Sequence, residues 1–261
     1  MNIGLIGCGS IGTFLLESLN IKGVLPGCRI SAVLEHKGKP EREVAERYGV
    51  TCCPDLESLL KSDLNMVVEA ANIQTVKAYA CRILESGKHM VIISIGALAD
   101  EEFGRKVEEA ARTGGAQIYL PSGAIGGLDI LKAAASMKQL DSVTLTTRKP
   151  AKSLTDEPLE AEKVLYDGTA SEAIRLFPKN INVSIILSLA GLGVHQTRVR
   201  IIADPSIDRN IHVIEASGAF GKMLLQVENT PMPSNTKTSY LAALSILSVL
   251  RNGSRNLHIG S

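Results

Sequence analysis

The first 120 residues alternate between short apolar runs and segments with helical spacing. Continuous apolar runs of strand length lie at 3–6, 29–34, 50–53, 66–68, 89–94 and 117–120. Segments whose apolar residues recur every three or four positions lie between them, at 13–19, 41–48, 55–60, 75–86 and 100–112. Strands that are apolar throughout and alternate with helices predict a parallel sheet covered by helices on both faces.

The pattern changes at residue 121, where a second glycine-rich turn (121–129) leads into a helix. Strand patterns follow at 142–147, 164–166, 198–203, 211–217 and 224–228, with a polar loop at 149–162 and helical segments at 171–177 and 180–189. This part of the chain predicts an α+β domain with a mixed or antiparallel sheet. A last helical segment begins at residue 238, and we expect it to pack back on the first domain.

A glycine-rich turn at residues 7–12 (G-C-G-S-I-G) follows the first predicted strand and opens the first predicted helix. This is the G-x-G-x-x-G spacing of a dinucleotide-binding turn, in the context that such a turn requires. Gly7 permits the tight turn, Gly9 lets the backbone approach a pyrophosphate, and Gly12 lets the helix pack against its strand. The free N–H groups of the helix start, including those of Ser10 and Ile11, favour the phosphates.

The chain is therefore predicted to be an α/β protein of two domains. The first is a Rossmann-type, doubly wound parallel sheet that binds a dinucleotide, at residues 1–120, joined by a C-terminal helix at 238–261. The second is an α+β domain at residues 121–237 that carries a mixed or antiparallel sheet. We expect this second domain to bind the substrate, to supply the catalytic groups and to form a dimer.

Composition narrows the classes of partner. The 261 residues carry a formal net charge of +1, with 45% hydrophobic residues, so no charge excess indicates binding to nucleic acid. No apolar run is long enough to cross a bilayer and the first residues lack the pattern of a secretory signal, so we expect no membrane association. The five cysteines show no C-x-x-C spacing, which favours a cytoplasmic protein without a metal site.

Residues that follow the predicted parallel strands should meet at one edge of the sheet, because ligands bind beyond the carboxyl ends of such strands. Glu35 ends the second strand, where a carboxylate binds the hydroxyls of a ribose; a solvated charge at a strand end is the alternative. Ala71 and Ser94 follow later strands, and we expect both to contact the cofactor. His36 and Lys37 come directly after Glu35, so the cofactor is predicted to be NAD or NADP.

The chemistry is expected to come from that cofactor, because the chain contains no nucleophile elbow, no Ser-His-Asp order and no H-E-x-x-H. Among the protein groups, His212 has the most polar surroundings, since a loop at 204–210 with two carboxylates leads into its strand. Such carboxylates orient an imidazole or raise its pKa. Asn210 and His212 point to the same face of an extended strand, while Ile211 and Val213 are expected to face the core. A structural histidine is the alternative.

Two amides lie at the start of the apolar helical segment that follows Pro178. Asn180 and Asn182 are suited to capping that helix, and equally to contacting a cofactor or a substrate carboxylate. The residues alone leave both interpretations open.

Several segments together resemble the L-aspartate dehydrogenase family over nearly the whole chain. They are the glycine turn 7–12 and the segments P-S-G-A-I-G-G-L-D (121–129), F-P-K-N-I-N-V (177–183), A-D-P (203–205), N-I-H (210–212) and N-T-K-T-S (235–239). The middle segments are far more specific than the glycine turn. The chain departs from the family at Thr236, where the family usually has a proline that would stiffen the loop, and at Asn72, where we expect a smaller Ser or Cys.

The resemblance implies that a nicotinamide dinucleotide oxidises L-aspartate to iminoaspartate, which hydrolyses to oxaloacetate and ammonia and can also feed NAD biosynthesis. By matching motif positions, His212 corresponds to the family's catalytic histidine, and Ala124 and Asn182 to cofactor contacts. The two substrate carboxylates suit helix N-termini after Pro178 and around 238–239. The predicted substrate contacts are accordingly Asn180, Asn210, Lys237, Thr238 and Ser239. An exposed sheet face in the second domain would suit a homodimer.

Two other functions remain open at this point. A reductase of the dihydrodipicolinate type shares the two-domain plan. That family carries the motif E-x-H-H followed by a lysine, and no His-His pair exists here. A nucleotide-sensing protein would bind NAD(P) without turnover. Mixing the protein with NAD⁺ and L-aspartate distinguishes these functions, because only the aspartate dehydrogenase would produce NADH.

Overall fold

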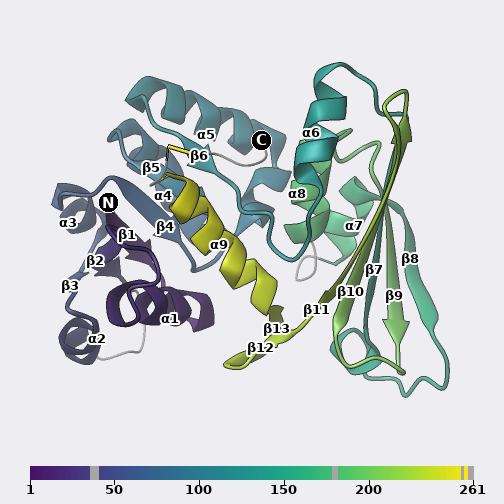
Figure 1. Cartoon of the computed structure of the whole chain (residues 1–261), viewed down its shortest axis with the longest axis horizontal. Helices are drawn as coiled ribbons and strands as arrows, with labels where there is room; N and C mark the ends of the chain where they lie inside the picture. Colours follow the sequence, from purple (N-terminus) through teal and green to yellow (C-terminus); the bar gives the residue numbers. More distant parts are fainter. Residues whose placement is uncertain (36–40, 178–181, 254–255, 258–261) are drawn as a thin grey trace. The chain divides into compact units, whose positions relative to one another are not determined.

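The structure is a computed structural model that describes residues 1–35, 41–177, 182–253 and 256–257. The chain divides into two compact units, whose helices and strands are labelled in Figure 1. Unit 1 comprises residues 1–121 and 246–257, and unit 2 comprises residues 122–245. Each unit is built around its own sheet.

Unit 1 contains a six-stranded sheet with the strand order β3-β2-β1-β4-β5-β6. All of its neighbouring strands pair in parallel. The strands are β1 (Asn2–Ile6), β2 (Arg29–Leu34), β3 (Thr51–Cys53), β4 (Met66–Glu69), β5 (His89–Ile92) and β6 (Ile118–Tyr119). The order reverses between β1 and β4, which is the point where doubly wound sheets bind their ligands. The predicted parallel sheet is confirmed.

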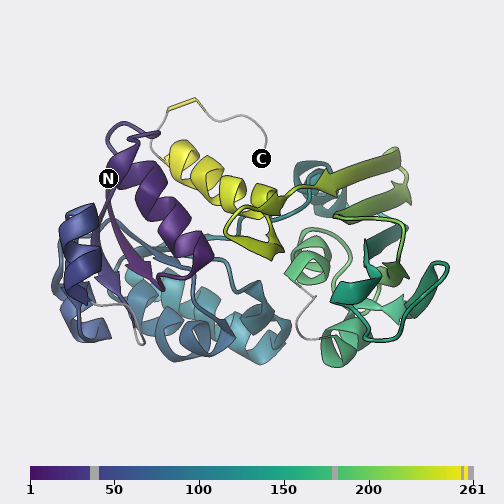
Figure 2. The ribbon, with the colours of Figure 1, turned by 90° about the horizontal axis from the view of Figure 1, so that it is seen from below.

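Helices cover both faces of this sheet. One face carries α1 (Ser10–Leu16, continued by a π-helical turn at Glu17–Ile21), α2 (Glu41–Tyr48) and the part of α9 (Tyr240–Gly253) that begins at Ile246. The other carries α3 (Leu56–Lys61), α4 (Ile73–Glu85) and α5 (Glu101–Gly114). Figure 2 shows α1 and α9 on one side of the sheet and α4 and α5 on the opposite side. A strand buried on both faces needs apolar side chains at every position, which explains the continuous apolar runs.

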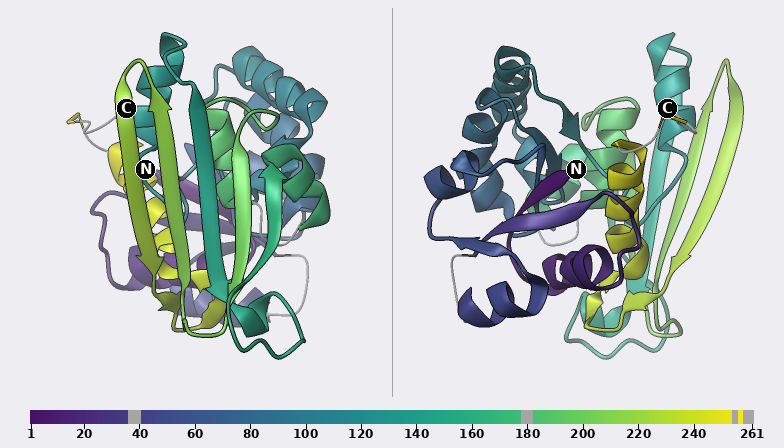
Figure 3. Two further views of the ribbon diagram at one scale, coloured as in Figure 1. Left: turned by 90° about the vertical axis from the view of Figure 1, so that its right-hand side faces the viewer. Right: turned by 60° about the vertical axis from the view of Figure 1, so that its left-hand side comes forward.

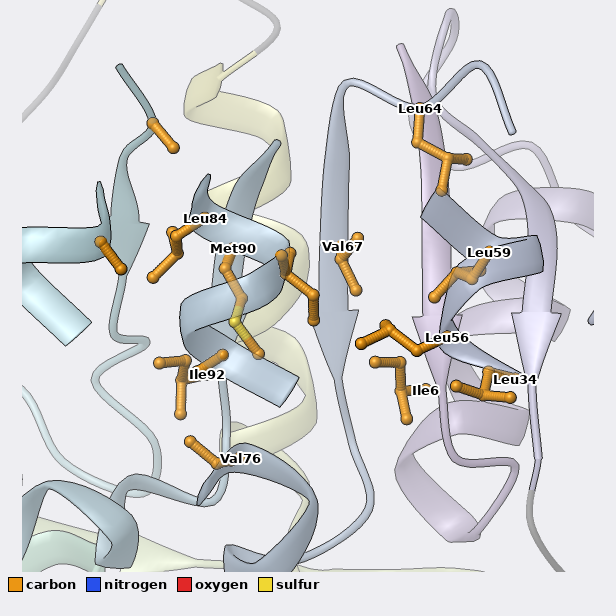
Figure 4. Close-up of a cluster of buried hydrophobic side chains, with 14 of the residues drawn as sticks. Ile6, Leu34, Leu56, Leu59, Leu64, Val67, Val76, Leu84, Met90 and Ile92 are labelled. Atoms are coloured by element: carbon orange, nitrogen blue, oxygen red, sulfur yellow. The ribbon is translucent and has the colours of Figure 1, made fainter. Parts of the chain in front are cut away.

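Alternate residues of each strand supply the two cores. Ile6, Val67 and Met90 project toward α3 and α4, where they pack with Leu59 and Leu84 (Figure 4). Their chain neighbours point to the other face and pack against α1, α2 and α9; they include Leu5, Val68 and Val91. This alternation follows from the two-residue period of a strand.

Side-chain caps determine where three helices of unit 1 begin. Asp55, Asn72 and Asp100 each accept a hydrogen bond from the backbone N–H three residues further on, at 2.7 to 3.1 Å. Each cap satisfies an N–H group that has no partner within its helix. Asn72, where we expected a smaller residue, therefore caps α4 with its side-chain oxygen.

Unit 2 contains a five-stranded sheet with the order β11-β10-β7-β9-β8. Its strands are β7 (Ser142–Pro150), β8 (Lys163–Thr169), β9 (Arg198–Asp204), β10 (Asn210–Gly218) and β11 (Gly221–Asn229). Strands β7 and β9 are parallel and the other neighbours antiparallel, so the predicted mixed sheet is confirmed. Figure 3 (left) shows this sheet from its open face, with α6 (Leu128–Ser136), α7 (Ala170–Leu176) and α8 (Asn182–Ala190) behind it.

The expected orientation of β10 was wrong. His212, Ile214 and Ala216 are buried on the side of the sheet that faces the helices, whereas Ile211 and Val213 are only half-buried, on the open side. Alternation along a strand defines two faces but does not say which of them is covered. The tertiary structure decides this, and the covered face is the one that carries the imidazole.

The expected helix start at residues 238–239 was also wrong. Thr238 and Ser239 end β13 (Asn235–Ser239), which pairs with β12 (Pro231–Met232), and α9 begins only at Tyr240. Pairing with β12 keeps this segment extended although it directly precedes an apolar helical pattern. The loop expected from residue 149 likewise begins later, because β7 continues to Pro150.

Candidate functional site

The glycine turn of unit 1 has the geometry that its spacing predicts. Gly7 has a φ of +97°, a backbone conformation that residues with a Cβ rarely adopt. A Cβ on Gly12 would lie 2.0 Å from the carbonyl oxygen of Gly7, so α1 packs against β1 more closely than any other residue would allow. A Cβ on Gly9, in contrast, would meet nothing within 4 Å. The fold therefore requires Gly7 and Gly12, while Gly9 borders open space in which a phosphate group fits.

Helix α1 begins at Ser10, directly after this open space. Its N-cap is Gly9, which has no side chain to satisfy the first N–H groups of the helix. Ser10 and Ile11 are half-buried in the first turn. This combination suits a pyrophosphate, which would receive N–H donors from the turn and the helix start.

Glu35 lies against the glycine turn. It follows β2, and its carboxylate accepts a hydrogen bond of 2.5 Å from the backbone N–H of Cys8. The two segments that the sequence assigned to phosphate and to ribose are therefore adjacent. His36 and Lys37, which made the choice between NAD and NADP uncertain, lie outside the described residues.

The sequence interpretation missed Glu69, which joins the loops after β4 and β5. One of its carboxylate oxygens accepts hydrogen bonds from the Ala71 N–H and the Ser94 hydroxyl, both at 2.8 Å. The other accepts from the N–H groups of Ile93 and Ser94, at 3.2 and 2.9 Å. Burial raises the pKa of Glu69, and its bonds to Ser94 oppose that shift. An acidic residue at the end of an entirely buried strand was the available signal.

His212 is the central residue of a buried polar group in unit 2. Its side chain is 3% exposed, and Nδ1 lies 3.0 Å from Oγ1 of Thr147, its register partner on β7. Burial lowers the pKa of His212 to about 4, and the positive charge of Lys149 contributes to this shift. The imidazole is therefore neutral near pH 7.

The carboxylates expected to raise the pKa of His212 act elsewhere. Asp204 accepts hydrogen bonds from the N–H and hydroxyl of Ser206 at 2.8 and 2.6 Å, and forms an ion pair with Arg148 at 3.0 Å. These contacts, with Ser206 the larger cause, lower the pKa of Asp204 itself. Of the two carboxylates in this loop, Asp204 is therefore engaged by its own turn and by an ion pair.

Lys149 is the second residue that the sequence interpretation missed. It follows Thr147 by two positions on β7 and so projects from the same face of the sheet as Thr147 and His212. Burial lowers the pKa of Lys149. A cation among buried strand residues is unusual, and the polar segment after residue 149 concealed this one, because it was assigned to a loop.

The structure places most of the other residues that were predicted to contact cofactor or substrate in unit 2. Asn210 faces Asn229 across β10 and β11, and Asn229 donates a hydrogen bond of 3.0 Å to the carbonyl of Ala124. This connects the predicted cofactor contact Ala124 to the strands that carry His212. Asn182 is exposed in the first turn of α8, and Ser239 is buried at the end of β13. Lys237 and Thr238 also lie in β13, and Asn180 lies outside the described residues.

Comparisons with known proteins match both halves of the chain. A family model described as the NAD-binding domain of homoserine dehydrogenase matches residues 7–121, and one described as the C-terminal part of aspartate dehydrogenase matches residues 129–253. L-aspartate dehydrogenases from Methanosarcina barkeri and Methanospirillum hungatei are 39% and 41% identical, each over the whole of both chains.

Solved structures agree with these matches. A crystal structure of aspartate dehydrogenase from Thermotoga maritima matches with a TM-score of 0.80 and 33% identity, covering 100% of this chain and 99% of that one. A myo-inositol dehydrogenase from Lactobacillus casei, at 14% identity and a TM-score of 0.61, shares the fold; the match covers 97% of this chain and 84% of that one.

The parallel sheet, the glycine turn and the adjacent Glu35 define an NAD(P)-binding oxidoreductase, as do the matches to dehydrogenases. The second unit narrows the class further, since it matches the C-terminal model over nearly its whole length. The chain belongs to the aspartate dehydrogenase family. Within the described residues, no helix is both long enough and apolar enough to span a membrane.

Proposed function

We propose that this protein oxidises L-aspartate to iminoaspartate with NAD or NADP, and that iminoaspartate then hydrolyses to oxaloacetate and ammonia. The observation that carries the proposal is the buried His212, held by Thr147 and accompanied by Lys149, in a chain whose relatives are named L-aspartate dehydrogenases. The proposal assigns pyrophosphate and ribose binding to unit 1, at Gly7, Gly9, Gly12 and Glu35.

The reaction divides into a hydride transfer and proton transfers. The bound cofactor supplies the hydride acceptor. As the Cα–H bond of aspartate breaks, the lone pair of its amine nitrogen forms the C=N bond, so the nitrogen must first lose a proton. His212 is neutral and takes that proton, and water then adds to the C=N bond and releases ammonia. Because Nδ1 is held by Thr147, the exchange is assigned to Nε2.

The low pKa of His212 is consistent with this role once the substrate is present. Burial and the charge of Lys149 hold that pKa near 4, which would make the free imidazole a weak base. Aspartate brings two carboxylates, and a carboxylate beside Lys149 would offset its positive charge and raise the pKa of His212. Lys149 is thus proposed to bind a substrate carboxylate, and His212 becomes a stronger base only in that complex.

The other contacts stay proposals. Ser10, Ile11, Ala71, Ser94, Ala124 and Asn182 are assigned to the cofactor, and Asn180, Asn210, Lys237, Thr238 and Ser239 to the substrate. The carboxylate-binding argument for residues 238–239 no longer includes a helix N-terminus, because these residues end a strand. It keeps the hydroxyl groups of Thr238 and Ser239.

Three finer proposals concern context. A carboxylate at Glu35 would repel a 2′-phosphate, so NAD is the preferred cofactor. The product iminoaspartate suits a role in NAD biosynthesis. None of the five cysteines forms a disulfide, in keeping with the cytoplasm. The open face of the unit 2 sheet, where Leu224 is 73% exposed, suits a homodimer.

The test is an absorbance assay for reduced cofactor with L-aspartate, and with D-aspartate and L-glutamate as controls. We expect NADH to form only with L-aspartate. In His212→Ala we expect kcat of the folded protein to fall by about 10²–10⁴ while NADH binding is retained, as for loss of an acid–base group. Cofactor binding without turnover in the wild type would refute the proposal. A kcat within about threefold of wild type in folded His212→Ala would remove His212 from the mechanism.

A further inference from the structure

Glu69 is a buried carboxylate that the proposed reaction does not use. It ends β4, in the middle of the sheet between β1 and β5, and its side chain is 0% exposed. Its four hydrogen bonds come from three backbone N–H groups and the Ser94 hydroxyl. Backbone N–H groups can only donate, and here they reach both oxygens, so they favour the ionised carboxylate against the burial that raises the pKa of Glu69. No cation forms an ion pair with Glu69 among the residues that the structure describes.

The loops that Glu69 joins border the glycine turn. A Cβ on Gly7 would lie 2.8 Å from the carbonyl oxygen of Ala70 and 3.0 Å from Cα of Ala71. Glu69 in turn bonds to Ala71 and Ser94, so its carboxylate joins the loops after β4 and β5, and the β4 loop lies against the glycine turn. This cluster is part of unit 1 alone.

The position of Glu69 and of the loops after β4 and β5 shows which end of the cofactor they would contact. Glu35 lies beyond β2, on the side of the glycine turn where the adenosine ribose is expected. A dinucleotide whose pyrophosphate lies over the turn extends across the reversal of strand order, so its other half lies over β4 and β5. That half is the nicotinamide, and the loops around Glu69 are the ones beneath it.

We propose that the buried charge of Glu69 makes the site prefer the oxidised nicotinamide ring. The oxidised ring carries a positive charge and the reduced ring is neutral. A carboxylate without a partner cation attracts the charged ring more strongly in a poorly hydrated interior than it would in water, because the interior has a lower dielectric constant. Glu69 is thus a positioning residue with an electrostatic effect. The inference rests on cofactor binding by unit 1 and deepens the proposed function.

The variant Glu69→Gln removes the charge at nearly constant shape. If the amide oxygen accepts from Ile93 and Ser94, the amide nitrogen can donate to the Ser94 hydroxyl, and only the Ala71 N–H loses its partner. Glu69→Asp is the matched control that keeps the charge. Loss of loop structure weakens every dinucleotide alike, whereas loss of the charge weakens only the oxidised form.

The experiment measures Kd by calorimetry for NAD⁺, NADH and benzamide adenine dinucleotide, an isostere of NAD⁺ in which an uncharged benzamide ring replaces the charged nicotinamide ring. We expect wild type to bind NAD⁺ about tenfold more tightly than the isostere, as for a charge pair at intermediate dielectric. Glu69→Gln should raise the Kd of NAD⁺ about tenfold more than that of NADH, and Glu69→Asp should keep the wild-type ratio.

The results distinguish failure of the proposed role of Glu69 from failure of the cofactor site itself. A Kd ratio in Glu69→Gln within about twofold of wild type would overturn the inference. Equal affinity of the wild type for NAD⁺ and its isostere would do so as well, and that measurement does not depend on the folding of any variant. Failure of the wild type to bind any of the three dinucleotides would instead refute the cofactor site in the proposed function.

Discussion

The buried imidazole of His212 should make the folded protein sensitive to mild acid. Its pKa is about 4 in the folded state, against 6.5 for an ordinary histidine. At a pH between these two values the imidazole is protonated in the unfolded chain but not in the folded protein, so acid favours unfolding. The stability that depends on a neutral His212 is complete above about pH 7 and is lost as the pH falls toward 4.

The size of the effect follows from the two pKa values. At about pH 5 nearly every unfolded chain carries the proton and about nine in ten folded molecules do not. The free energy of unfolding should therefore be about 2 kcal/mol lower than at about pH 7.5, from this histidine alone. Other groups also titrate in this range, and a variant that lacks only His212 removes them from the comparison.

The assay is urea unfolding of wild type and His212→Gln, followed by circular dichroism because the chain has no Trp. The stability difference between the two proteins should fall by about 2 kcal/mol from about pH 7.5 to about pH 5, in the direction of a less stable wild type. Nitrogen-15 spectra of the imidazoles give the pKa directly. A difference that stays constant with pH, or a His212 that titrates near 6.5, would refute the reasoning.

Lys149→Met separates the two causes of the low pKa. Desolvation is the larger cause and the charge of Lys149 the smaller. Removing the charge while keeping an apolar stem should raise the pKa of His212 only in part. Full recovery to 6.5 would show that the charge, and not burial, dominates.

Three further predictions concern the site. Gly9→Ala should abolish NADH binding and leave Tm unchanged, because its Cβ enters open space. Gly12→Ala should lower the free energy of unfolding by about 3 kcal/mol, because its Cβ would lie 2.0 Å from a carbonyl oxygen. Equal NADH binding by wild type and Gly9→Ala would contradict the phosphate assignment. Glu35→Ser should narrow or reverse the preference for NAD over NADP in kcat/KM, and a wild type that strongly prefers NADP would show that Glu35 does not face the ribose. Lys149→Met should raise KM for L-aspartate about tenfold or more, as for loss of a charge-assisted bond to a carboxylate, and an unchanged KM would exclude Lys149 from substrate binding.

Local patterns determined much of unit 1. Continuous apolar runs are needed by strands buried on both faces, and Asp55 and Asp100 cap helices at their predicted starts. The glycine spacing predicted a turn that the backbone requires at Gly7 and Gly12. These features depend on residues close in sequence or on one repeating period, so a sequence displays them directly.

Tertiary structure decided the chemistry of both candidate sites. His212 was visible in the sequence, but its burial, its contact with Thr147 and its depressed pKa depend on β7, which lies 65 residues earlier in the chain. Glu69 and Lys149 looked like a strand end and a loop residue until the sheets placed them beside Ser94 and His212. The pKa of a group depends on every charge and dipole that the fold gathers around it, and no local pattern encodes those distances.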